Sequence, residues 1–408
     1  MLIEVIKLVN KFLKSHELLR RLIVMIFVLI MFIIGRNIIL YGIDVSKLLE
    51  ERENIQNLLV SVVSGDLNRY SILALGIMPN MTASILVQFV TVVLPSNVRK
   101  RISQHKLDVI TVILTFLFAC FLAYSRTNEL EYLDLGISIF ELKVISMIEM
   151  VIGAMAILLL TKINKDYGIG SQTPIILINI IEGLYTSISN NLGNIPILLV
   201  IICAAIFAIT ILIENIELRI PVQRVSIHNI YADKNYIAFK INLIGIMPIM
   251  FSTSIFILVK YILYAIGGYF PDNYMLLHIN ANMDLTSRIG VNTYLMIVFI
   301  LTILFAFIML QPSEMADNLQ KGGDSIVGVY AGKSTKRYFS FTILVLGIVS
   351  GVILSASMAL SLLLAVENVI PSDLSMLPSS IMILVSVVSN MLDEAIGYYK
   401  FDSYKFFI

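Results

Sequence analysis

The sequence predicts an all-α polytopic membrane protein, with ten transmembrane helices in two inverted five-helix halves around a central pore. Two observations lead to this fold class. Of the 408 residues, 58% are hydrophobic and 14% are charged, which is too apolar a composition for a soluble globular chain. The tetrapeptide Gly-Ile-Met-Pro also occurs twice, at 76–79 and at 245–248.

Ten apolar stretches approach or exceed the roughly 20 residues that a helix needs to cross the hydrocarbon layer. We expect helices in these stretches and no strands, because every backbone amide must be satisfied within lipid. The predicted spans are 18–40, 71–93, 107–125, 144–163, 172–189, 194–215, 241–266, 291–311, 339–364 and 378–399.

The basic residues predict how these spans are oriented. With the N-terminus in the cytoplasm, 21 of the 29 Lys and Arg residues lie in cytoplasmic segments. The opposite orientation leaves only the other eight there, so both termini are expected to be cytoplasmic. Residues 2–14 are expected to form an amphipathic helix on the membrane surface, because their apolar and Lys side chains separate onto different faces.

The two copies of the tetrapeptide fall in the second and the seventh span, which are matching places in two blocks of five. Because five is an odd number, the second block enters the membrane with the opposite orientation. A helix-breaking motif at matching points of two inverted halves indicates a functional site where the repeats meet. The predicted halves are residues 1–190 and 191–408.

A short apolar segment at 54–64 lies between the first and second spans. Its apolar side chains follow helical spacing, and they are Ile55, Leu58, Leu59 and Val62. The segment could fold back into a pore as a plug, or it could lie on the membrane surface as an interfacial helix. Spacing alone does not separate these two interpretations.

Two connections in the second half, 216–240 and 312–338, are long, polar and rich in turn residues. Both are predicted to project from the cytoplasmic side, as a docking surface for a soluble partner would. The alternative is two solvated loops without a partner, although loops of this length usually have a function.

Five motifs together resemble SecY, the channel subunit of the Sec protein translocase. They occur in the family's order and cover nearly the whole chain. The motifs are residues 71–88 around the first tetrapeptide, Tyr167-Gly168-Ile169-Gly170, Arg219-Ile220-Pro221-Val222-Gln223, residues 240–248 around the second tetrapeptide, and residues 316–323. The resemblance implies a SecY-like fold and a protein-conducting channel without enzymatic activity or a cofactor.

Two departures from the family's pattern narrow the resemblance. The Ile-Arg-Pro-Gly run that serves the motor ATPase reads Val329-Tyr330-Ala331-Gly332 here, and the run after Gly170 is altered to Ser171-Gln172. With its short C-terminal tail, the chain resembles the accessory SecY of Gram-positive bacteria. That resemblance implies the plasma membrane, an accessory SecA ATPase, small SecE-like or accessory Sec subunits, and a secreted serine-rich glycoprotein adhesin as cargo. Membrane lipid is an expected partner and nucleic acid is not.

The resemblance also implies a ring of apolar side chains that closes the pore. Such a ring excludes ions by dewetting while it remains able to part around a polypeptide. Taken singly, each of these residues is more typical of ordinary packing. The implied ring consists of Ile77, Met81, Leu177, Ile181, Met250 and Val388.

Two further sets of residues follow from the resemblance. Gln88 and Asn242 match the lateral gate between the second and seventh spans, and the alternative is an ordinary hydrogen bond between helices. The residues expected to dock the motor are Arg219, Arg224, Tyr330 and Lys333. Arg219 and Arg224 could instead serve only to fix the orientation of the chain.

The competing function is a secondary transporter of a small solute, which would also have inverted repeats and broken helices. Such transporters use charged residues near the midplane, and the nearest candidates here, Lys260 and Glu149, fall toward span ends. Cys120 and Cys203 lie inside spans and are interpreted as small apolar fillers. No Cys/His cluster has metal-ligand spacing, so a metal site is not expected.

Overall fold

The computed structural model describes residues 17–43, 70–94, 102–128, 130, 132–133, 136, 138–191, 196–224, 235–245, 247–269, 282–367, 369–371 and 374–404. The amphipathic helix predicted at 2–14 and the plug predicted at 54–64 lie outside the described residues.

A helix of the structure overlaps each of the ten predicted spans. In chain order these helices are α2 (Glu17–Arg36), α5 (Met78–Val93), α7 (Gln104–Thr127), α8 (Ile139–Tyr167), α9 (Thr173–Asn190), α10 (Ile197–Asn215), α11 (Met247–Tyr269), α13 (Arg288–Leu310), α15 (Lys333–Val366) and α16 (Leu377–Tyr404). Within the described part of the chain, seven helical stretches are long and apolar enough to cross a membrane, and they include α2, α7, α8, α10, α13, α15 and α16.

The chain forms two compact units. Unit 1 contains residues 1–186 together with 387–408, and unit 2 contains residues 187–386. The C-terminal part of α16 therefore belongs to the unit that contains the N-terminal spans. The halves predicted from the sequence, 1–190 and 191–408, remain a prediction about membrane topology.

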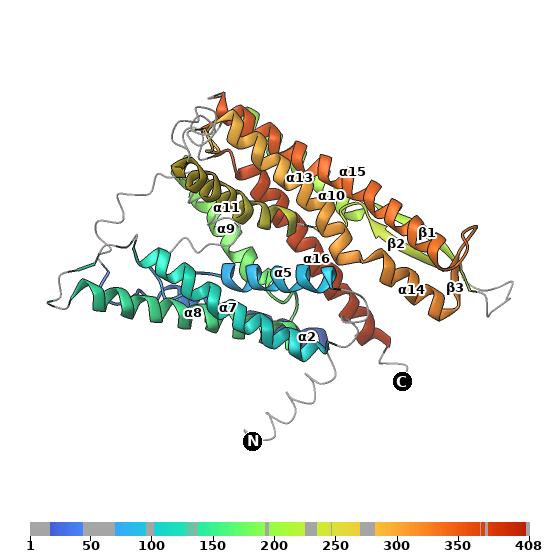
Figure 1. The fold of residues 1–408 in the computed structure, drawn as a ribbon, viewed down its shortest axis with the longest axis horizontal. Helices are drawn as coiled ribbons and strands as arrows, with labels where there is room; N and C mark the ends of the chain where they lie inside the picture. Colours follow the sequence, from blue (N-terminus) through green and yellow to red (C-terminus); the bar gives the residue numbers. More distant parts are fainter. Residues whose placement is uncertain are drawn as a thin grey trace, which may run out of the picture. The chain divides into compact units, whose positions relative to one another are not determined.

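In unit 1, α7 packs against α5 and α8, and α2 packs against α8 (Figure 1). The core of this unit includes Ala119 and Ala123 of α7 and Met150 of α8, all fully buried. Small residues on α7 let the helices approach closely, which is how helices associate in membranes. The turn that precedes α5 packs into the same core through Ala74 and Leu75.

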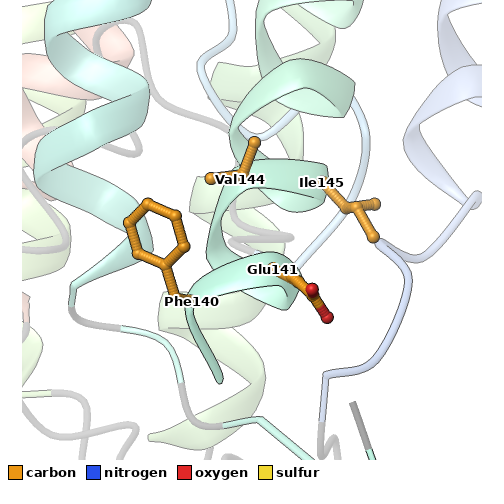
Figure 2. A pocket seen from close by; sticks show the side chains of 4 residues that line it. All are labelled: Phe140, Glu141, Val144 and Ile145. Carbon is orange, nitrogen blue, oxygen red and sulfur yellow. The ribbon is translucent and has the colours of Figure 1, made fainter. Parts of the chain in front are cut away.

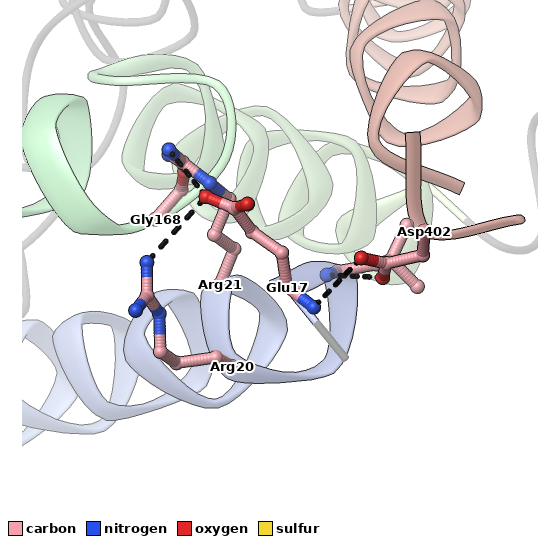
Figure 3. A network of polar contacts seen from close by, with 6 residues as sticks. Glu17, Arg20, Arg21, Gly168 and Asp402 are labelled. Carbon is pink, nitrogen blue, oxygen red and sulfur yellow. Dashed lines mark hydrogen bonds and ion pairs between the residues drawn. The ribbon is translucent and has the colours of Figure 1, made fainter. Parts of the chain in front are cut away.

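The start of α2 and the C-terminal part of α16 meet in unit 1. The backbone N–H groups of Glu17 and Leu18, at the start of α2, donate to the two carboxylate oxygens of Asp402 on α16, each at 3.0 Å. The Arg21 guanidinium lies 4.2 Å from the centre of the Tyr398 ring. Figure 3 shows Asp402 beside the first turn of α2. A carboxylate at a helix start satisfies N–H groups that have no partner within the helix.

In unit 2, α13 packs along α15, and α11 packs against α13. The aromatic pairs Phe251–Phe305 and Phe256–Tyr294 join α11 to α13, with ring centres 5.4 and 5.8 Å apart. A side chain at Gly351 of α15 would meet the Phe299 ring at 3.0 Å, so glycine permits the close approach of α13 and α15.

In the described part of unit 2, three short strands form a small sheet beside the helices. They are β1 (Glu217–Arg224), β2 (Tyr236–Lys240) and β3 (Asp324–Ile326), and the sheet order is β2-β1-β3 with both pairings antiparallel. The strands lie in the two long connections rather than in the spans, so the backbone argument against strands in lipid does not apply to them. The helix α14 (Pro312–Gly322) precedes β3 (Figure 1).

Candidate channel and docking sites

The two copies of Gly-Ile-Met-Pro share the conformation of the glycine and the start of a helix at the methionine. Gly76 has φ 55° and Gly245 has φ 67°, a left-handed conformation that glycine adopts without strain. A helix then begins at the methionine in each copy, α5 at Met78 and α11 at Met247. Proline is the second residue of each helix, where its missing N–H costs no hydrogen bond. The motif therefore ends a turn and begins a helix in both units.

The residues of the predicted pore ring have different environments. Ile77, at the start of α5, and Met81, in its first turn, are 0% and 3% exposed. Ile181 is 49% exposed, whereas Leu177 and Val388 are half-buried. Five of the six residues belong to unit 1 and Met250 belongs to unit 2, where its side chain lies outside the described part. The ring remains a prediction.

The start of α9, which positions Leu177 and Ile181, is organised by a buried asparagine. The side-chain amide of Asn164 donates to the carbonyl groups of Ile169 (2.8 Å) and Ser171 (2.6 Å). Ser171 has φ 50°, which is uncommon for a residue other than glycine. The N–H of Gly170 donates to Glu394 of α16 at 2.8 Å. These bonds hold the altered Gly-Ile-Gly run in one conformation.

Asn242, one of the two predicted gate residues, is buried and donates to the carboxylate of Glu214 at 2.8 Å. Glu214 lies in the last turn of α10, is 2% exposed, and also accepts a hydrogen bond from Ser386 of α16. The alternative interpretation of Asn242 was an ordinary hydrogen bond between helices; in the structure Asn242 lies in the segment before α11, and its bond joins that segment to α10. Gln88, the other predicted gate residue, is half-buried on α5. The gate role of both residues remains a prediction.

The two predicted docking loops are joined by the sheet. Residues 217–221 of β1 pair with β2 from the same loop, and residues 222–224 pair with β3 from the other loop. Pro221 lies where β1 changes partner, a position that suits a residue unable to donate to a continuous ladder. Its carbonyl accepts from the N–H of Val327 at 3.3 Å.

A hydrophobic core fixes this sheet on the helices below it. Its members are drawn from the strands, α14 and α15, and they include Ile220, Phe239, Ala316, Ile326, Phe339 and Ile343. The rings of Phe239 and Phe339 pack edge to face with centres 6.1 Å apart. Both loops are therefore parts of one folded platform.

The predicted docking residues lie on and beside this platform. The Arg219 side chain is 61% exposed; it pairs with Glu217 at 3.6 Å and lies 4.8 Å from the centre of the Tyr236 ring. Tyr330 is 88% exposed, and Lys333 is the exposed first residue of α15. Arg224 is in β1, with its side chain outside the described part. Motor docking by these residues remains a prediction.

A hollow of about 340 Å³ lies at the N-terminal end of α8, and none of its lining residues belongs to a predicted site. It is lined by Phe140, Glu141, Val144 and Ile145, and Figure 2 shows these side chains on neighbouring turns of that helix end. Three of the four lining side chains are apolar and Glu141 is the fourth, so the lining offers no cluster of reactive side chains.

Sequence reasoning missed three charged residues in the apolar helices. Arg36, the last residue of α2, forms an ion pair with Glu182 in the middle of α9, and Glu214 is the third. Charges in a membrane span are expensive, and they are functional candidates by default. The charges are visible in the sequence, but only Lys260 and Glu149 were predicted there as the charges nearest the midplane.

The two charged residues that the sequence did single out have partners. Lys260 of α11 contacts Asp284 at 2.6 Å, and Glu149 of α8 accepts from the N–H of Tyr41 at 3.0 Å. Each contact joins a helix to a connecting segment within its own unit.

Solved structures share the fold of this chain. The chain is similar to a structure titled "The structure of a protein conducting channel", with a TM-score of 0.65, 17% identity, and coverage of 94% of this chain and 93% of that one. It is also similar to a structure titled "Sec61 in the Canine ribosome-channel complex from the endoplasmic reticulum", with a TM-score of 0.60 and 16% identity. The second similarity also covers 94% of this chain and 93% of that one. Both similarities show that the chain has the fold of a protein-conducting channel.

The family follows from the sequence. The SecY family model matches residues 71–392, and the chain belongs to the SecY family. It is therefore a multi-pass membrane protein of a family of translocation channels, not of enzymes, as the motifs predicted.

Relatives within the family agree with the narrower resemblance. A protein of Leuconostoc gelidum subsp. gasicomitatum, named accessory Sec system protein translocase subunit SecY2, is 29% identical over 406 residues, covering 93% of this chain and 94% of the relative. A protein of the same name from Streptococcus agalactiae is 27% identical over 391 residues, with coverage of 93% and 94%. The protein translocase subunit SecY 1 of Lactobacillus kefiranofaciens is 26% identical over 414 residues, with coverage of 94% and 95%. The predicted resemblance to the accessory branch is confirmed.

Proposed function

We propose that this protein is the channel of an accessory Sec system and exports large serine-rich glycoprotein adhesins across the bacterial plasma membrane. The observation that carries the proposal is the match to the SecY family over residues 71–392, together with relatives named accessory SecY2 that align over more than 90% of the chain. The adhesin cargo follows from the accessory resemblance and from nothing else in the chain.

The proposed architecture is ten transmembrane helices in two inverted halves around a pore, with both termini in the cytoplasm. The ten helices at the predicted spans support this count. The shared geometry of the two Gly-Ile-Met-Pro copies supports a repeat. In this architecture the apolar ring closes the pore, residues 54–64 act as its plug, and Gln88 and Asn242 lie at the lateral gate.

The proposed motor partner is an accessory SecA ATPase that docks on the sheet and the start of α15. Three exposed basic residues, Lys333, Lys336 and Arg337, lie in the first turns of α15. The helix macrodipole disfavours cations at this end, so these residues do not serve the stability of α15. An acidic surface on a partner would offset the repulsion, which supports docking here. Small SecE-like or accessory Sec subunits are further proposed partners, as is membrane lipid.

A secondary transporter of a small solute gains no support from Lys260 and Glu149, the two charged residues predicted as candidates for ion coupling. Lys260 and Glu149 are each engaged with a neighbouring segment of their own unit, which is a structural use of a charge rather than ion coupling. Solute uptake by the purified protein alone would nevertheless favour that function over the proposed one.

The proposed function is tested by crosslinking a stalled secretory chain to the channel. A photoreactive amino acid at Met81 should form an adduct with the stalled chain, because the predicted ring contacts polypeptide in transit. The matched control is Phe121 of α7, an apolar residue that is 70% exposed and lies outside the ring; the same group there should form none. Equal yields at Met81 and Phe121, or none at either, would contradict the proposed path.

A further inference from the structure

The helix α9 has one buried face and one exposed face. Its buried residues include Ile176, Asn179 and Ile180, each at most 2% exposed. Ile181 and Tyr185 are 49% and 70% exposed, and they are four residues apart, so they lie on one face. The rotation of α9 about its axis therefore decides which side chains it presents.

Glu182 lies at the border between these faces, three residues after buried Asn179 and three before exposed Tyr185. Its carboxylate pairs with Arg36, whose side chain is 6% exposed, whereas that of Glu182 is 36% exposed. Arginine carries a permanent charge and a planar fork of donors. A pair at the border between two faces resists rotation in either direction, because turning α9 would separate the carboxylate from a buried cation.

A second arginine of α2 holds the segment just before α9. Arg21 donates to the carbonyl oxygen of Gly168 at 3.0 Å. The two contacts occur in the same order along both segments, so α2 and α9 run in the same direction. Arg21 and Arg36 are separated by about 22 Å of helix at a rise of 1.5 Å per residue. The helix α2 thus contacts both the segment that leads into α9, at Gly168, and the middle of α9, at Glu182.

We propose that the Arg36–Glu182 ion pair is a positioning device that sets the rotation of α9 and keeps the face with Ile181 toward the transport path. Only the statement that this face lies toward a transport path rests on the proposed function. The rotation itself is a property of unit 1 and is measured without cargo or motor.

The test measures cysteine labelling on adjacent residues of α9. Cys120 and Cys203, which are both free thiols, are replaced by alanine, and single cysteines are placed at Ile181 or Ile180. A water-soluble maleimide should label Ile181→Cys at least about tenfold faster than Ile180→Cys, because thiol reactivity requires exposure to water. In Glu182→Gln this ratio should fall toward unity. The double variant Arg36→Glu/Glu182→Arg should restore it.

The matched control is Arg20→Gln, which removes an arginine of α2 that pairs with Glu17 at 3.5 Å and is 45% exposed. It should leave the ratio unchanged. If Glu182→Gln does not fold, Arg36→Lys is the deciding variant, because lysine keeps the positive charge but lacks the planar set of donors of the guanidinium. A labelling ratio below the parental value supports the proposal, and a parental ratio overturns it.

Two other results would overturn the inference. One is a parental ratio in folded Glu182→Gln, which would make the pair a membrane anchor without influence on rotation. The other is equally slow labelling at both positions of the parent, which would place the Ile181 face against lipid. Failure to export cargo with a normal labelling pattern would instead count against the proposed function alone.

Discussion

Gly153 determines how closely α8 approaches the turn that precedes α5. A methyl group at this position would lie 2.0 Å from the carbonyl oxygen of Ile72, a separation that no side chain allows. Because Ile72 belongs to the turn that leads into the first Gly-Ile-Met-Pro copy, one missing side chain on α8 sets the position of a motif on another element.

We predict that Gly153→Ala destabilises the protein, although alanine favours helices. The helix propensity gain is at most about 1 kcal/mol, whereas overpacking costs about 1–3 kcal/mol, so the apparent melting temperature in detergent should fall. The matched control is Gly397→Ala on α16, where an added methyl group meets nothing within 4 Å. That change should raise the melting temperature slightly or leave it unchanged. A rise in both variants would refute the close approach.

Some of the buried polar side chains join segments that are far apart in the sequence. Glu214 accepts hydrogen bonds from Asn242 and Ser386, so its oxygen joins α10, the segment before α11, and α16. A buried carboxylate without such donors would be costly. The sequence shows that these residues lie in apolar stretches, but it does not reveal their partners, which are up to 172 positions away.

At the scale of elements, the sheet turns two loops into one platform. β1 pairs with β2 from its own loop and with β3 from the loop after α13. The length and polarity of the loops predicted a docking surface but no regular structure within it. The pairing of β1 with β3 depends on segments about 100 residues apart, and alternation over a three-residue strand is too short to detect.

Tyr330 and Ala331 on this platform are predicted to reduce use of a housekeeping motor. In family members an arginine at this place is a charged donor suited to a carboxylate. Tyrosine would lose a charge-assisted contact worth about 2–3 kcal/mol if desolvated. Tyr330 is 88% exposed, so it is free to be replaced without damage to the fold. Tyr330→Arg with Ala331→Pro should therefore shift binding toward the housekeeping SecA.

The measurement is the affinity of both motors for parent and double variant in proteoliposomes at fixed salt. Ser334→Ala is a suitable control, because Ser334 is exposed beside Lys333 and its change adds no charge. If the parent already binds the housekeeping motor as tightly as the accessory one, the altered run has no part in motor choice.

Across the whole molecule, the sequence predicted what apolar length and local motifs determine. The ten predicted spans each overlap a helix, although α15 begins at Lys333 and not at 339, because a helix can continue beyond the membrane through polar turns. Long-range pairs were not predictable in this way. Arg36 and Glu182 lie in different apolar stretches, and no local pattern in either one indicates that they meet.

The contact between the start of α2 and the C-terminal part of α16 leads to a prediction about how distant parts of the molecule stabilise each other. Asp402 accepts one hydrogen bond on each carboxylate oxygen, from Glu17 and Leu18, and thereby caps α2 from a position 385 residues away. Removing a helix cap costs about 0.5–2 kcal/mol. Asp402→Ala should lower the apparent melting temperature of the purified protein, and Asp402→Asn should lower it less because its amide keeps one acceptor oxygen.

Asp166→Ala provides the control for a lost surface carboxylate. Asp166 is exposed in the last turn of α8, where a negative charge faces the unfavourable end of the helix dipole, so its removal should not destabilise. The difference between the two positions separates capping from net charge. If the Asp402→Ala and Asp166→Ala variants both have the parental melting temperature, the first turn of α2 does not depend on α16. A loss at Asp402 alone would mean that α16 stabilises the first turn of α2, so that two helices at distant positions in the sequence support each other within unit 1.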